Sequence, residues 1–99
     1  MPKSGASKTE LVSRSLLNLN VPNLLLVNTT PSLDGKGIIL HLREVEGGHA
    51  ILDIPRLQEE SGAISLEEVS VLEEELSVLT APLLIEHYET RFIKLTFDQ

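Results

Sequence analysis

The stretch GIILHLREV (residues 37–45) decides the fold class of this chain of 99 residues. Its apolar and polar side chains alternate, so that Ile38, Leu40 and Leu42 share one face. A period of two is that of a β-strand with one buried and one solvated face. We therefore predict a strand over residues 37–45.

The residues that follow predict a partner for this strand. Glu46-Gly47-Gly48 closes it, and HAILDI (residues 49–54) then alternates in the same phase. Paired glycines supply the positive φ that a tight hairpin needs. Residues 37–54 are therefore predicted to form a β-hairpin.

The rest of the chain contains further short runs of this kind. Residues 16–19 and 24–27 are apolar and lie on either side of Pro22. Because proline cannot donate a ladder hydrogen bond, we predict two strands joined by a bend. Towards the end of the sequence, residues 83–85 and 91–97 alternate as half-buried strands do.

One segment, residues 65–79, is ambiguous. Its leucines and Val69 recur at spacings of three and four, which is the period of a helix. Val69-Ser70-Val71 alternates instead, and valine favours strands. Periodicity alone leaves helix and strand open here.

Several short strands separated by Gly, Pro and Asn turns are typical of an all-β domain, and we predict a small antiparallel β-sandwich over residues 16–99. Residues 1–15 are predicted to be a disordered or flexible leader, because Met1–Ser7 has no large apolar residue after the methionine. A leader that continues directly into strands is also expected of a piece of a longer protein. The predicted core is the apolar stripe Ile38, Leu40, Leu42, Ala50, Leu52, Ile54, Ile93, Leu95 and Phe97.

The composition argues against several classes of function. The chain has no Cys, which excludes a disulfide scaffold, thiolate metal sites and a cysteine nucleophile. Its net charge of -7 disfavours nucleic acid as a partner. No apolar run reaches the roughly 20 residues of a membrane span, so no membrane partner is predicted. With no Trp and one Tyr, stacking on sugar rings has little support, and glycan binding is left open.

Two groups of residues are candidates for a site. His41 and His49 would flank the predicted hairpin, and with Asp53 or Glu44 they offer ligands for a metal. Their spacing matches no metal motif, so we interpret them as surface histidines. Seven glutamates with no Lys or Arg among them lie within residues 59–75. We interpret these glutamates as a solvated face, with a negatively charged docking surface as the alternative.

Four stretches occur in an order and spacing that cover residues 16–97: LLLVNTTP (24–31), DGKGIILHLREV (34–45), VSVLEE (69–74) and EHYETRFIKL (86–95). Together they resemble strands in the C-terminal β-domain of family 38 glycoside hydrolases, the retaining α-mannosidases. The resemblance implies a β-sandwich and favours strand over helix in the ambiguous segment. In that family the zinc site and the catalytic carboxylates belong to upstream domains. The resemblance therefore implies no catalytic residue, metal or cofactor in this chain.

We accordingly expect a non-catalytic accessory domain that packs on and supports the catalytic domains of an α-mannosidase-like glycoside hydrolase, which would be its partners. The polar face with His41, Arg43, His49 and Lys94 is the predicted contact surface. One alternative is an independent carbohydrate- or protein-binding β-sandwich module. Another is a small metal-dependent enzyme that uses His41 and His49.

Overall fold

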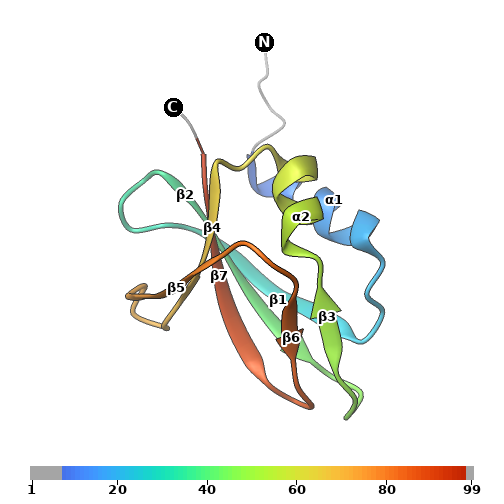
Figure 1. Cartoon of the computed structure of the whole chain (residues 1–99). Coiled ribbons are helices and arrows are strands. Elements are labelled where there is room, and N and C mark those ends of the chain that lie inside the picture. The colour runs from blue at the N-terminus through green and yellow to red at the C-terminus, as the bar shows by residue number, and fades with distance from the viewer. Residues whose placement is uncertain (1–7, 98–99) are drawn as a thin grey trace.

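The computed structural model describes residues 8–97, which form strands in two antiparallel sheets together with two helices (Figure 1). The larger sheet has the strand order β1-β2-β7-β4-β5, and β3 pairs with β6 in a small second sheet. The prediction of a mainly β fold built from antiparallel strands is confirmed. The elements are α1 (Lys8–Leu19), β1 (Leu24–Pro31), β2 (Gly37–Glu44), β3 (Ala50–Leu52), α2 (Ile54–Ser61), β4 (Ser65–Val69), β5 (Glu75–Leu79), β6 (Leu83–Ile85) and β7 (Thr90–Thr96).

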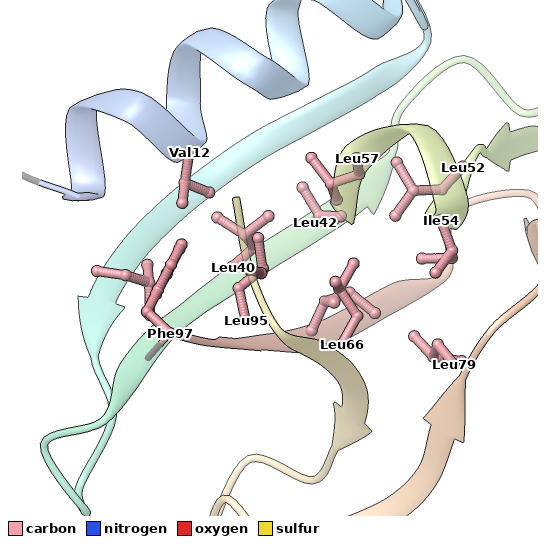
Figure 2. Packing of buried hydrophobic residues seen from close by; sticks show 13 residues of the cluster. Val12, Leu40, Leu42, Leu52, Ile54, Leu57, Leu66, Leu79, Leu95 and Phe97 are labelled. Carbon is pink, nitrogen blue, oxygen red and sulfur yellow. The ribbon is translucent and has the colours of Figure 1, made fainter. Parts of the chain in front are cut away.

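The core lies between one face of the larger sheet and the two helices (Figure 2). Leu40 and Leu42 reach it from β2, and Leu95 reaches it from β7. Val12 of α1 and Leu57 of α2 pack against them from the other side, and both are fully buried. All nine residues of the predicted apolar stripe are buried, none with more than 7% of its surface exposed. The prediction of the core is therefore confirmed.

The first helix corrects the prediction of a leader over residues 1–15 and of a strand over residues 16–19. Val12, Leu16 and Leu19 are spaced by four and three, which is the period of a helix face, and all three pack on the core. Burial of this face outweighs the polar composition of the segment. Residues 1–7 of the predicted leader lie outside the described residues.

The predicted hairpin over residues 37–54 is wrong in its pairing. Both edges of β2 are already occupied, because β1 pairs along one edge and β7 along the other. The strand β3 pairs with β6 instead. Ile54, expected at the end of the second strand, belongs to α2. Asp53 sets the start of this helix, because the Asp53 carboxylate accepts a hydrogen bond from the Arg56 N–H at 3.2 Å. Pro55 at the first turn also favours a helix start.

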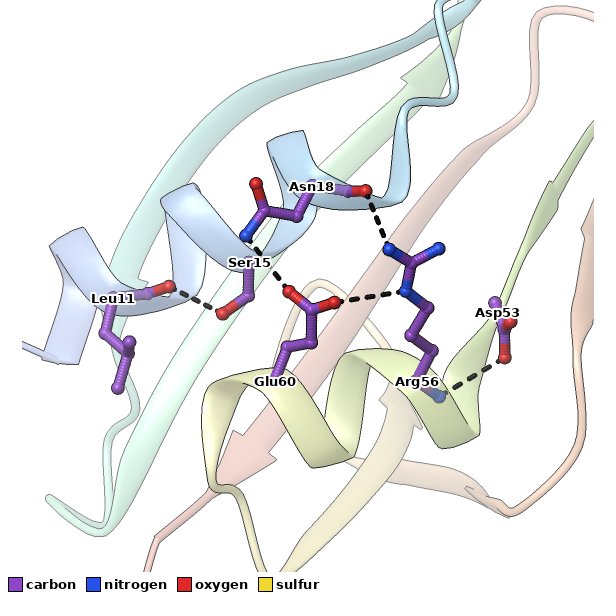
Figure 3. Close-up of polar contacts among 6 residues, drawn as sticks. All are labelled: Leu11, Ser15, Asn18, Asp53, Arg56 and Glu60. Carbon is purple, nitrogen blue, oxygen red and sulfur yellow. Dashed lines mark hydrogen bonds and ion pairs between the residues drawn. The ribbon is translucent and has the colours of Figure 1, made fainter.

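The two helices lie side by side and are joined by polar contacts (Figure 3). Asn18 Nδ2 donates to Glu60 Oε1 at 3.0 Å, and Arg56 Nε donates to Glu60 Oε2 at 3.1 Å. Arg56 also donates to the Asn18 carbonyl at 3.3 Å. The hydrogen bond from Asn18, followed by the contacts with Arg56, lowers the pKa of Glu60. These contacts fix how α1 and α2 sit over the core.

The ambiguous segment of residues 65–79 is strand and not helix, as the resemblance favours, but it forms two strands, and residues 70–74, expected within a strand, are the turn between them. The strands β4 and β5 pair antiparallel, with Leu66 opposite Leu79, and both leucines are buried. A turn joins them, in which Glu73 adopts a positive φ of 66°. The helical spacing of the apolar residues does not mark a buried face, because Leu72 and Leu76 are exposed.

The carboxylate of Glu44 at the end of β2 is fully buried and joins three segments of the chain. It accepts a hydrogen bond from Asn23 Nδ2 at 2.8 Å in the turn between α1 and β1. It also accepts bonds from the backbone N–H groups of residues 46–48 at 3.0, 2.9 and 3.2 Å and from the Tyr88 N–H at 3.0 Å. Burial by itself raises the pKa of Glu44, but the hydrogen bonds, with that from Tyr88 first, outweigh it and lower the pKa to about 2.

Replacement of this carboxylate, Glu44→Gln, should lower Tm at neutral pH by on the order of 10 °C, because an amide NH₂ group would face backbone donors. The pKa of Glu44 is lower in the folded state than its ordinary value of 4.5. Its contribution to stability is therefore present above pH 4.5 and lost as the pH falls towards about 2. Thermal unfolding across this range should show that loss in the wild type and a smaller loss in the variant. Equal pH profiles for the two proteins would contradict this account of Glu44.

The packing of α1 is tested by Val12→Ala, which should lower the free energy of unfolding by about 2 kcal/mol through lost apolar burial and the cavity left behind. Leu17→Ala on the same helix is the control, because Leu17 is 78% exposed and its replacement should change the free energy by less than about 0.5 kcal/mol. Urea unfolding measures both. If residues 8–15 were a flexible leader, neither variant would change the free energy of unfolding.

Candidate binding surface

The structure brings three of the four predicted contact residues onto one face. His41 and Arg43 of β2 and Lys94 of β7 lie on the outer face, by which we mean the face of the larger sheet that points away from the helices. His49 does not join them, because it precedes β3 of the small sheet. It is exposed, and its carbonyl accepts a hydrogen bond from Asn23 Nδ2 at 3.0 Å.

Two of these three side chains are engaged within the protein. The His41 ring stacks on Phe92, with centroids 4.5 Å apart and 22° between the planes. Lys94 forms an ion pair with Asp34 in the turn between β1 and β2, and only 16% of the Lys94 side chain is exposed. The hydrogen bond from Lys94, followed by one from Ser32, lowers the pKa of Asp34 far below its ordinary value. The outer face is therefore less available to a partner than its sequence predicts.

The histidines and carboxylates of the described residues form no metal site. His41 and His49 belong to different parts of the fold, and within residues 8–97 no group of three or more His, Asp or Glu side chains is placed to hold a metal ion. One carboxylate pair does form, between Glu67 and Glu75. Their hydrogen bond, together with partial burial and the charge of Glu75, raises the pKa of Glu67.

A shallow apolar groove lies between α1 and β1, with a volume of about 400 Å³. No charged side chain lines it, and the sequence did not predict it. The lining residues are Ser13, Leu16, Leu17, Asn20, Val21, Pro22, Leu24, Leu25 and Leu26.

The edge strand β1 beside this groove is protected against pairing with another strand. The N–H of Leu24 donates to the Val21 carbonyl at 3.1 Å, and the N–H of Thr29 donates to Asn28 Oδ1 at 2.9 Å. Pro31 has no N–H, and a β-bulge interrupts the strand in the middle. Because an added strand needs free backbone donors on a regular edge, β1 is a poor template.

The opposite edge of the sheet is more open. The strand β5 and the turn before it expose four large apolar side chains: Val71 (73%), Leu72 (73%), Leu76 (61%) and Val78 (58%). We call these four residues the hairpin patch. Figure 1 shows β5 at the end of the sheet away from the helices. Exposed apolar residues that gather in this way mark interaction sites more often than isolated ones do.

Glutamates surround the hairpin patch. Glu73, Glu74 and Glu75 lie between Leu72 and Leu76 in the sequence, and the carboxyl group of Glu67 shares a hydrogen bond with that of Glu75. None of these four forms an ion pair with a described residue, whereas neighbouring Glu68 pairs with Arg91 at 2.8 Å. The sequence alone favours a solvated face for this run, with a docking surface as the alternative. The apolar residues between the glutamates were the feature that could have pointed to the second interpretation.

Comparison with family models, with curated proteins and with solved structures finds no match to this chain. Across residues 8–97, neither helix has the length and apolar character needed to cross a membrane. The candidate surface therefore depends on its geometry alone.

Because the tip of the hairpin is exposed, the double change Val71→Ser and Leu72→Ser should alter the free energy of unfolding by less than about 0.5 kcal/mol. Urea unfolding measures this. A loss of several kcal/mol would mean that these side chains are covered within the folded chain, and the hairpin patch would then not be a free surface.

Proposed function

We propose that this chain is a non-catalytic accessory domain that binds another protein surface through the hairpin patch. The observation that carries the proposal is the exposure of four large apolar side chains on β5 and the turn before it. Water is a poor environment for such side chains, and covering them on a partner gains free energy. Glu44 and His41, by contrast, are engaged within the fold.

The catalytic domains of an α-mannosidase-like glycoside hydrolase are the partner that we propose to test first. The support is the resemblance to the C-terminal β-domain of family 38. Of the stretches that carry it, residues 24–31 are a strand, and residues 37–44 and 90–95 are strand within the second and fourth stretches. The third stretch, residues 69–74, is mainly the turn between β4 and β5. An accessory domain in this setting stabilises the catalytic part or shapes the edge of its cleft.

The test is to produce the chain together with a family 38 catalytic region encoded in the same genome and to measure the complex by light scattering and calorimetry. We expect a one-to-one complex that the double change Val71→Ser and Leu72→Ser weakens by about tenfold or more. Leu17→Ser is the matched control, because Leu17 is 78% exposed but lies on α1, which Figure 1 shows away from β5. It should leave the affinity unchanged.

Two results would count against the proposal. If no complex forms, the glycoside hydrolase is not the partner. If the complex forms but the double change Val71→Ser and Leu72→Ser leaves its affinity unaltered, the domain binds through another surface.

A further inference from the structure

We infer that the hairpin patch binds a partner surface that carries apolar side chains flanked by lysine or arginine. The inference rests on the proposed function, since it names the chemistry of the surface that the hairpin binds. It is carried by the apolar side chains and the uncompensated glutamates occurring together on one edge of the sheet.

The apolar side chains lie in two pairs along the hairpin. Val71 and Leu72 form the tip, and Leu76 and Val78 follow on β5. A partner surface with apolar side chains of its own can cover both pairs.

The glutamates of the hairpin favour a partner surface with positive charge. Glu73, Glu74 and Glu75 follow the tip directly, and no described cation pairs with them. Glu73 is held in place, because its Oε1 accepts a hydrogen bond from the Leu33 N–H at 2.8 Å. The carboxyl groups of Glu67 and Glu75 hydrogen-bond each other, which raises the pKa of Glu67. Lys94 lies opposite Glu67 in the sheet and pairs with Asp34, so cationic groups on a partner would be drawn mainly to Glu73, Glu74 and Glu75.

The same charges argue against a second copy of this chain as the occupant. A twofold pairing through β5 would bring the glutamates of one copy against those of the other. Like charges placed directly opposite each other in a sheet are unfavourable. The chain as a whole also carries a net charge of -7, which adds to the repulsion.

The experiment uses the full chain, labelled with ¹⁵N, and a short amphipathic helical peptide of leucine and lysine as the probe. A second peptide with glutamate in place of lysine is the probe control. Chemical-shift changes locate the binding site, and titration gives Kd. We expect changes centred on residues 70–79 with the lysine peptide only, and binding that weakens as NaCl rises from about 50 mM to about 300 mM.

Two matched pairs of variants separate local chemistry from overall charge. Glu74→Lys and Glu59→Lys both change the net charge from -7 to -5, but Glu59 lies on α2, away from the hairpin. We expect Glu74→Lys to raise Kd about fivefold and Glu59→Lys to raise it less than about twofold. The double change Val71→Ser and Leu72→Ser should raise Kd about tenfold, with Leu17→Ser on α1 as its control.

Three outcomes would overturn the inference: equal effects of the two lysine variants, shift changes in the groove between α1 and β1, or equal binding of the glutamate peptide. The proposed function fails separately. If Glu74→Lys leaves the affinity for the catalytic region unchanged, the proposed function stands and this inference is wrong. If the hairpin binds the lysine peptide but the chain forms no complex with the catalytic region, this inference stands and the glycoside hydrolase is not the partner.

Discussion

The buried carboxylate of Glu44 is the constraint on which the loops at one end of the fold depend. Asn23 and Tyr88 are far from Glu44 in sequence, and both donate to its oxygens together with the N–H groups of residues 46–48. A single side chain thereby fixes the entry into β1, the exit from β2 and the entry into β7. Removing its charge would leave several buried donors without an acceptor, so these three loops are expected to loosen together.

The fold was predictable where the spacing of apolar residues in the sequence matches the face that is buried. Strand β2 and all nine core residues follow from alternation in the sequence, because a strand with one buried face imposes it. The partners of β2 did not follow, since pairing depends on which strands reach its two edges. The helix α1 was missed because its polar composition hides an apolar face at Val12, Leu16 and Leu19. The start of α2 depends on Asp53 and Pro55, residues that also end strands.

The candidate site was predictable in part. The sequence drew attention to the glutamates of residues 59–75, but their interpretation as a solvated face ignored the apolar residues between them. Exposure of Val71 and Leu72 depends on the turn that carries them past the core, and no local pattern reports it. For the same reason His41 and Lys94 were expected to be free, whereas Phe92 and Asp34 engage them from other parts of the chain.

The unlike edges of the sheet have a consequence for stoichiometry. A strand-rich domain with two open edges can join copies end to end, and growth of that kind has no natural limit. Here the backbone of β1 is closed by its own turn, by Asn28 and by Pro31, which blocks growth of the larger sheet at that edge. Copies therefore cannot stack into one continuous larger sheet, because that would need both of its edges.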